Sequence, residues 1–307
     1  MIVWEIYGDQ RIKENRRISL HPPKASDGGS LSGVFSDKVA LIETLLKLRE
    51  AGNVSFSEDI VVVAEGCDDG NYLPLIITAL TLDGTPREIR LFLTNGNDAM
   101  IQTAAKVGYR ALHARDINPP NVHGGICNAF DRYPSKLDEF PKSQKIFIPF
   151  RLGAVGSYSE IEKLIGQRIP VMGQSGMCAL CLLLDTEKTR TMLQTEHRER
   201  LIFRKKTGYI EYFRPLDPPI IPILKRYIPY DQLDQILDSL KNNPKSREGH
   251  PTYPCVTAFS GLPDVVKLVE ASGGRILNSG LLKVPHETIT DRKNDIDMCP
   301  VWISPVK

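Results

Sequence analysis

Residues 58–80, EDIVVVAEGCDDGNYLPLIITAL, decide the fold. Ile60 to Ala64 form a continuous, mostly β-branched apolar run, which predicts a strand buried on both faces of a parallel sheet. Gly66 and Gly70 mark a turn after this strand, and we expect the apolar segment that follows to be helical. A buried strand that leads through a glycine turn into a helix indicates the start of a βαβ unit.

The alternation of strands and helices continues on both sides of this stretch. A leucine-rich helix is predicted to open at Ser36 or Asp37 and to end at Gly52. Further predicted elements are strands at 87–94, 109–114 and 145–150, a helix at 98–107 closed by Gly108, and a strand within 169–185. This spacing predicts an α/β fold with a Rossmann-like, doubly wound, mostly parallel sheet.

The pattern fades after about residue 205, where short strands and helices are separated by a loop rich in proline, glycine and lysine. The predicted elements there are a strand at 208–213 and helices at 230–241 and 263–271. We therefore expect three regions: an N-terminal arm at 1–33, a core at 34–205, and an irregular C-terminal extension at 206–307 that packs on the core.

Composition narrows the class of protein. The 307 residues carry a formal net charge of +2, so an anionic partner has to be inferred from local clusters and not from the whole chain. Six scattered cysteines favour reduced thiols in the cytoplasm over a disulfide scaffold. No apolar stretch reaches the roughly 18 residues of a membrane-spanning helix, and the N-terminus does not fit a signal peptide, so we expect no membrane partner.

The glycine turn is the candidate ligand site, because bare backbone at the carboxyl end of a parallel strand lets a ligand approach closely. We assign Gly66, Cys67, Asp68 and Gly70 to it. Acidic side chains in the turn disfavour a pyrophosphate, whereas the sulfonium and amino groups of S-adenosylmethionine suit them. A plain tight connection between a strand and a helix would use the same glycines, and that alternative stays open.

Two further positions fit a nucleoside bound at this edge. Asn95 ends the second predicted strand, with Asp98 just beyond it, where a group that binds ribose hydroxyls belongs. Asp116 follows the predicted strand at 109–114, where an adenine amino group would be bound. Asn and Asp are also common turn formers, so each position has a structural alternative.

From Lys38 to about Gly108 the order of features resembles the poxvirus cap-specific 2′-O-methyltransferases, which also stimulate the viral poly(A) polymerase. The resemblance is carried by a lysine that opens a leucine-rich helix (DKVALIETLLKL), the strand and turn VVAEGCDDG, and the segment LFLTNGNDAMI. It implies a viral S-adenosylmethionine-dependent methyltransferase that acts on or binds RNA. It also implies a Lys-Asp-Lys-Glu tetrad in which a lysine deprotonates the ribose 2′-hydroxyl.

Most of that tetrad is missing from this chain. Lys38 matches the first lysine and is the candidate catalytic residue. Unsuitable residues stand where the aspartate, second lysine and glutamate belong: 149–151, 178–184 and 220–224. Lys188 and Glu211 are nearby candidates if the register is shifted. The resemblance therefore allows a catalytically degenerate member.

A basic segment at 190–206 is the candidate contact with RNA. If it is helical, its cationic side chains would form a ridge that binds phosphates: Arg198, Arg200, Arg204, Lys205 and Lys206. Glu196 and Glu199 lie among these residues and can pair with them, so a solvated amphipathic helix is the alternative.

Other functions also stay open. A nucleotide-sugar glycosyltransferase would use Asp68 and Asp69 to hold a divalent cation and a pyrophosphate. A non-catalytic structural or scaffolding protein with a methyltransferase fold would need no tetrad. A protein partner or a homo-oligomer is compatible with each of these. Cys178 and Cys181 have C-x-x-C spacing, but no second pair of ligands follows, so we predict no metal site.

Overall fold

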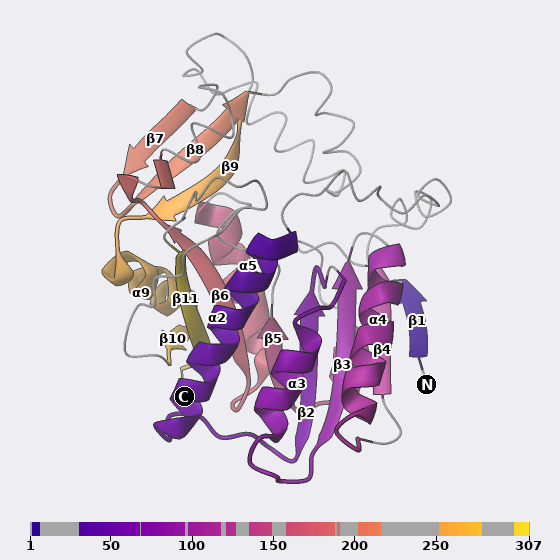
Figure 1. Cartoon of the computed structure of the whole chain (residues 1–307). Helices are drawn as coiled ribbons and strands as arrows, with labels where there is room; N and C mark the ends of the chain where they lie inside the picture. The colour runs from indigo at the N-terminus through magenta and orange to yellow at the C-terminus, as the bar shows by residue number, and fades with distance from the viewer. Residues whose placement is uncertain are drawn as a thin grey trace.

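The computed structural model describes residues 2–6, 31–67, 69–95, 98–117, 121–126, 135–148, 158–187, 189–190, 202–215, 252–277 and 298–306. The described residues form one eleven-stranded, mostly parallel sheet with helices on both faces (Figure 1). The prediction of a doubly wound, Rossmann-like α/β fold is confirmed by this arrangement.

The parallel part of the sheet has the strand order β1-β4-β3-β2-β5-β6. Its strands are β1 (Ile2–Ile6), β2 (Asp59–Glu65), β3 (Glu88–Asn95), β4 (Asn121–Ile126), β5 (Gln144–Ile148) and β6 (Met177–Leu184). The chain order reverses between β2 and β5, so their carboxyl ends lie at the switch point where open α/β sheets bind ligands.

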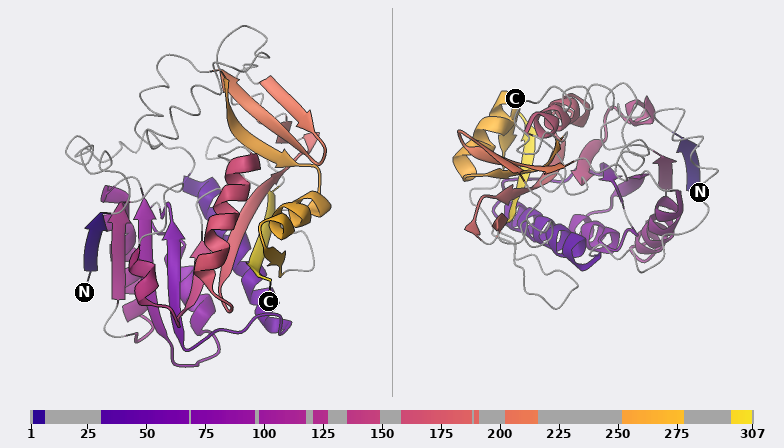
Figure 2. Two further views of the ribbon diagram at one scale, coloured as in Figure 1. Left: turned by 180° about the vertical axis from the view of Figure 1, so that it is seen from behind. Right: turned by 90° about the horizontal axis from the view of Figure 1, so that it is seen from above.

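Antiparallel strands complete the sheet beyond β6. β11 (Met298–Pro305) pairs with β6, and β10 (Gly274–Ile276) pairs with β11. A separate antiparallel group consists of β7 (Ile202–Lys206), β8 (Tyr209–Pro215) and β9 (Thr252–Phe259). β9 joins β6 only at Leu183 and Leu184, and the group rises past the carboxyl ends of the parallel strands (Figures 1 and 2).

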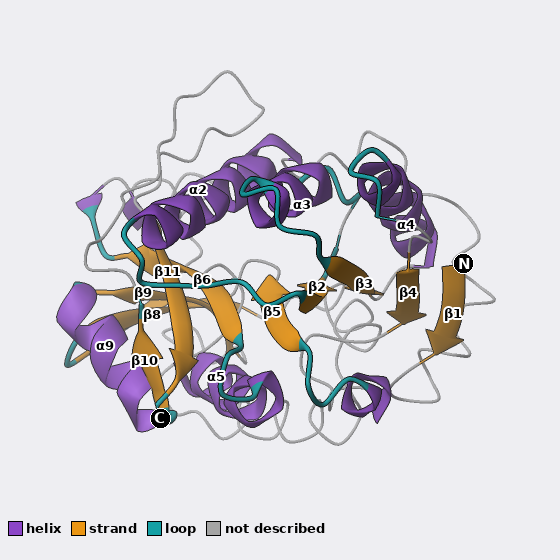
Figure 3. Ribbon diagram, turned by 90° about the horizontal axis from the view of Figure 1, so that it is seen from below, coloured by secondary structure: helices purple, strands orange, loops and turns teal. Residues whose placement is uncertain are grey.

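Helices cover both faces of the sheet. Seen from below, α2 (Leu31–Glu50), α3 (Leu73–Thr81) and α4 (Asp98–His113) lie on one side, and α5 (Tyr158–Met172) and α9 (Leu262–Ala271) on the other (Figure 3). Each side has its own apolar cluster: Ile60 and Val62 belong to the first, Val61 and Val63 to the second. Because successive strand residues point to opposite faces, the middle of β2, from Ile60 to Ala64, is apolar at every position.

The third predicted strand was placed wrongly. Residues 109–113 form the end of α4, and the strand β4 lies instead at Asn121–Ile126, where none was predicted. Gly108 does not end α4. A Cβ there would collide with the Leu91 side chain, so this glycine lets α4 pack closely on β3. Gly108 therefore allows close packing of the helix on the sheet, and it does not mark the end of the helix.

Both ends of the chain contribute strands to the sheet, which the sequence did not predict. Within the expected arm, Ile2–Ile6 pair with β4 as an edge strand. Within the expected C-terminal extension, β11 lies directly beside β6. Trp302 on β11 is fully buried and donates a hydrogen bond from Nε1 to the Leu41 carbonyl at 2.7 Å. The last strand is therefore part of the core. The helix predicted at 230–241 lies outside the described residues.

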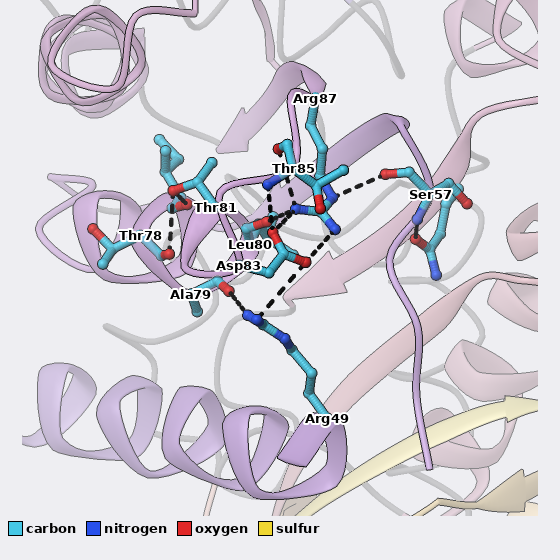
Figure 4. A network of polar contacts seen from close by, with 11 residues as sticks. Arg49, Ser57, Thr78, Ala79, Leu80, Thr81, Asp83, Thr85 and Arg87 are labelled. Carbon is cyan, nitrogen blue, oxygen red and sulfur yellow. Dashed lines mark hydrogen bonds and ion pairs between the residues drawn. The ribbon is translucent and has the colours of Figure 1, made fainter. Parts of the chain in front are cut away.

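At the edge where β3 begins, two arginines bind the C-terminal end of α3 (Figure 4). Arg49 donates to the Ala79 carbonyl at 3.1 Å, and Arg87 donates to the Leu80 carbonyl at 2.7 Å. Both guanidinium groups also pair with Asp83. The cations satisfy terminal carbonyls and oppose the partial negative charge at this end of the helix.

This network makes the stability of the fold depend on pH. Its hydrogen bonds with Arg87 hold the pKa of the Asp83 carboxyl well below its usual value. The Asp83 carboxylate therefore stabilises the fold above about pH 4, the pKa of an unfolded aspartate, and this contribution is lost as the pH falls toward the folded-state pKa. We expect Asp83→Asn to be less stable than wild type at neutral pH, with a difference that shrinks on acidification. Urea unfolding across this range measures it, and a pH-independent difference would contradict it.

Candidate functional site

The carboxyl ends of β2 and β3 lie side by side, with Glu65 opposite Thr94 in a parallel register. The chain leaves β2 through Gly66, whose backbone is left-handed (φ 55°). The Cys67 N–H then donates to the Thr94 carbonyl at 2.9 Å, which fixes the turn against the end of β3. The structure thus brings the turn and Asn95 to one edge of the sheet, as the sequence predicted.

Close packing against α4 explains why residue 70 is a glycine. Its backbone is also left-handed (φ 74°), and a Cβ there would lie 2.7 Å from the Cα of Ala104 on α4. No side chain fits between the turn and the helix, so glycine is needed here with or without a ligand. Gly66 is half-buried, and its left-handed backbone is by itself a reason for glycine at this position.

Asp69 stands just before α3 and bonds within the turn. Its Oδ1 accepts the Asn71 backbone N–H at 3.2 Å, and its Oδ2 accepts the Asn71 amide at 2.6 Å. Pro74, in the first turn of the helix, has no N–H to offer. The negative charge of Asp69 in the turn and the missing N–H of Pro74 both make this approach to α3 unfavourable for an anionic ligand. Asp68 lies outside the described residues.

Of the other residues predicted to contact a nucleoside, two lie near Gly66 and one does not. Asn95 is the last residue of β3 and half-exposed, at the same edge as Gly66. Asp98 is the first residue of α4, directly beyond that edge. Asp116 is exposed, with φ 58°, in the connection from α4 back to the start of β4. Because that connection lies at the amino edge of the sheet, the structure does not bring Asp116 together with the other candidates.

Sequence reasoning missed a buried ion pair at the base of the turn. Glu65 ends β2, and its Oε2 lies 2.9 Å from both Nε and Nη2 of Arg168 on α5. The two side chains are only 5% and 1% exposed. An acidic residue at the end of an otherwise apolar strand was the available signal, since buried charges are seldom left unpaired. The distant partner on α5 had no signal in the sequence.

The N-terminus of α5 is held by the antiparallel strands. Glu211 on β8 is 9% exposed, and its Oε1 accepts the Tyr158 backbone N–H at 3.2 Å. The Tyr158 ring stacks on Tyr209 with centroids 4.3 Å apart, and burial raises the pKa of its hydroxyl. A carboxylate at a helix N-terminus is a favourable cap. Glu211, considered as a substitute for the missing catalytic glutamate, is thus engaged in anchoring α5.

The tetrad of the suggested family is not assembled by the described residues. Lys38 lies within α2, which starts at Leu31 and not at Ser36 or Asp37. The position of the second lysine falls in β6, where every residue from Met177 to Leu184 is buried. The other two positions, 149–151 and 220–224, lie outside the described residues, as does Lys188.

Cys178 and Cys181 are not arranged to share a ligand. Both lie in β6, but Cys178 belongs to the apolar cluster under α5 and Cys181 to the cluster under α2. Residues three apart in a strand point to opposite faces, so the C-x-x-C spacing has no chelating geometry here. On the neighbouring β11, burial raises the pKa of the Cys299 thiol to about 12.

The described residues contain neither a candidate metal site nor a membrane-spanning helix. No group of three or more His, Cys, Asp or Glu side chains in the described part of the chain has the arrangement of a metal site. Likewise, none of the helices in the described ranges is long and apolar enough to cross a membrane.

The basic segment was expected to be helical, but its residues 204–206 form part of a strand. Arg204, Lys205 and Lys206 lie in β7, paired with β8. Lys205 and Lys206 are exposed, but neighbouring residues in a strand point to opposite sides, so the two do not extend one ridge. Arg198 and Arg200 lie outside the described residues.

No family model and no curated protein sequence matches the chain. Among solved structures, it is similar to an S-adenosylmethionine-dependent methyltransferase from Clostridium acetobutylicum (TM-score 0.43, 7% identity, 96% of this chain and 99% of the other). It is also similar to the mitomycin 7-O-methyltransferase MmcR (TM-score 0.44, 13% identity, 96% and 60%). A third match is a 1,6-didemethyltoxoflavin-N1-methyltransferase from Burkholderia thailandensis with bound S-adenosylhomocysteine (TM-score 0.46, 7% identity, 97% and 88%).

Nothing in these comparisons points to the poxvirus cap-specific family in particular. The three identities are at most 13% and the TM-scores are below 0.5, so the assignment of the fold rests on the strand order itself.

Proposed function

We propose that this protein binds S-adenosylmethionine at the carboxyl edge of β2 and β3 and belongs functionally with the methyltransferases. The nucleoside would lie along the Gly66 turn, with its ribose toward Asn95. The observation that carries the proposal is Asp69, whose carboxylate, bonded to Asn71, puts a negative charge in the turn that a nucleotide's phosphates would meet.

Charge separates the candidate ligands. S-Adenosylmethionine carries a sulfonium and an amino group, which a carboxylate in the turn attracts, and no phosphate. A nucleotide sugar carries a pyrophosphate that Asp69 would repel unless a divalent cation stood between them. The turn therefore favours the methyl donor over the nucleotide sugar.

Titration calorimetry tests the choice of ligand. We expect S-adenosylhomocysteine to bind the full chain in the presence of a chelator, because no metal ion takes part in holding it. UDP-glucose should not bind, with or without Mn²⁺. Binding of UDP-glucose that requires Mn²⁺, together with no binding of S-adenosylhomocysteine, would support the glycosyltransferase instead.

The affinity for the donor tests the role of Asn95. A carboxylate accepts ribose hydroxyl hydrogen bonds more strongly than an amide does, by about 1 kcal/mol per bond. We therefore expect Asn95→Asp to tighten the binding of S-adenosylhomocysteine by about fivefold, the equivalent of one such bond. Calorimetry measures this change. Weaker binding by the variant would show that Asn95 does not face the ribose.

The acceptor that we propose is RNA. The exposed Lys205 and Lys206 on β7 support it: although they point to opposite sides of the strand, each offers one phosphate contact. β7 belongs to the strands that rise past the carboxyl edge of the parallel sheet (Figure 1). Phosphate contacts of this kind are strongly weakened by salt. Filter binding of capped RNA should therefore weaken in Lys205→Ala/Lys206→Ala and at raised salt. Equal binding by variant and wild type would remove these lysines from the acceptor site.

A further inference from the structure

The buried pair of Glu65 and Arg168 stands directly before the Gly66 turn. We propose that Arg168 is a positioning residue for donor binding, which acts through Glu65. This inference rests on the proposed function, because it concerns the same turn. It adds a residue from α5, on the opposite side of the sheet from α2, α3 and α4, to the determinants of the donor site (Figure 3).

The geometry links α5 to the last residue of β2. By the alternation of the strand, Glu65 is on the same face as Val61 and Val63, which pack in the cluster under α5. Arg168 donates from Nη1 to the Leu164 carbonyl of its own helix at 2.8 Å. Its Nε and Nη2 both lie 2.9 Å from Glu65 Oε2. The guanidinium is thus held by the helix backbone and in turn holds the carboxylate.

Stability alone does not account for this pair. Two charges that leave water lose so much solvation that replacing a buried pair with uncharged residues of similar size is often neutral or stabilising. What is unusual is the place of the pair, one residue before Gly66. A glycine has wide conformational freedom, so it does not hold itself in one orientation.

The turn is held on both sides of that glycine. After Gly66, the Cys67 N–H is bonded to the Thr94 carbonyl. Before Gly66, the guanidinium of Arg168 fixes Glu65. A turn held in this way is already ordered before the ligand binds, so ordering the turn does not reduce the free energy of binding. Removing the contact between Glu65 and Arg168 should therefore lower the affinity for the donor more than it lowers the stability of the fold.

A double variant separates these two quantities. In Glu65→Gln/Arg168→Met both charges are removed, so no unpaired charge is buried and the melting temperature should stay close to that of wild type. The dissociation constant for S-adenosylhomocysteine, measured by calorimetry, should nevertheless rise about tenfold, because the fork that orients Glu65 is gone. If the pair were merely structural, affinity would be retained along with stability, and that result would overturn the proposal.

Arg168→Lys is the second variant, in case the double variant does not fold. Lysine keeps the charge balance but cannot contact the carboxylate through two nitrogens of a planar fork. We expect a folded protein with a weaker affinity for S-adenosylhomocysteine; unchanged affinity in a folded Arg168→Lys protein contradicts the proposal.

An ion pair at the other end of the same strand provides the matched control. Arg90 pairs with Asp59, the first residue of β2. Asp59→Asn/Arg90→Met should leave the affinity for S-adenosylhomocysteine unchanged, and an equal loss of affinity there would also overturn the proposal. Wild-type protein that binds no S-adenosylhomocysteine contradicts the proposed function itself, whereas wild-type binding retained in the Glu65 and Arg168 variants contradicts only this inference.

Discussion

Replacing Trp302 with alanine is expected to lower the free energy of unfolding by about 4 kcal/mol, within the range for removing a large aromatic side chain from a core. Trp302 is fully buried on β11, in the apolar cluster that also contains Leu41 and Leu45 of α2. Its Nε1–H is bonded to the Leu41 carbonyl. Alanine would leave a cavity between the last strand and this helix and would deprive a buried carbonyl of its donor.

Trp302→Phe serves as the control. Phenylalanine keeps most of the ring volume but cannot donate to Leu41, so we expect a smaller loss, about 1–2 kcal/mol. Urea unfolding of the three proteins measures both differences. If Trp302→Ala cost less than about 0.5 kcal/mol, the ordinary effect of a surface substitution, β11 would not be part of the core.

Gly66→Asn is expected to abolish binding of S-adenosylhomocysteine while leaving the fold nearly as stable as wild type. Asparagine tolerates the left-handed backbone (φ 55°) better than other residues with side chains do. Its side chain would nevertheless stand at the carboxyl edge of β2, in the space where the ligand approaches the backbone. The loss of binding is therefore expected without a matching loss of stability.

Gly70→Ala provides the contrast. A Cβ there meets the backbone of Ala104, so this variant should lower the melting temperature through a clash between the turn and α4. Calorimetry and thermal melting of the two variants separate the roles of the two glycines. Wild-type affinity in a folded Gly66→Asn protein would place the ligand elsewhere.

Much of the fold could be predicted because its signals are local. The strands β2, β3, β5 and β6 are apolar runs next to turn residues. The first three were predicted at nearly their observed bounds, and β6 lies within the segment predicted to contain a strand. The prediction failed at β4, whose sequence NVHGGI contains two glycines and resembles a loop. A parallel strand buried between two neighbours is stabilised by its pairing, which local propensity does not record.

Long-range contacts explain what else was missed. The pairing of β11 with β6 and the contact of Trp302 with Leu41 join segments far apart in the chain. The contact of Arg168 with Glu65 is of the same kind. Of the candidate site residues, the positions of Gly66 and Asn95 in the fold could be predicted, because each directly follows or ends a recognisable strand. Asp116 could not be placed, because its position depended on the strand that was assigned wrongly.

Hydrogen exchange with and without S-adenosylhomocysteine tests the central claim most directly. The account predicts slower exchange for backbone amides of residues 65–72 and at the end of β3, where the ligand would cover the turn. It predicts no change at the C-terminal end of α3, which the Arg49 and Arg87 network holds at the other edge of the sheet. Unchanged exchange at 65–72 under saturating ligand, or protection confined to another part of the chain, would contradict it.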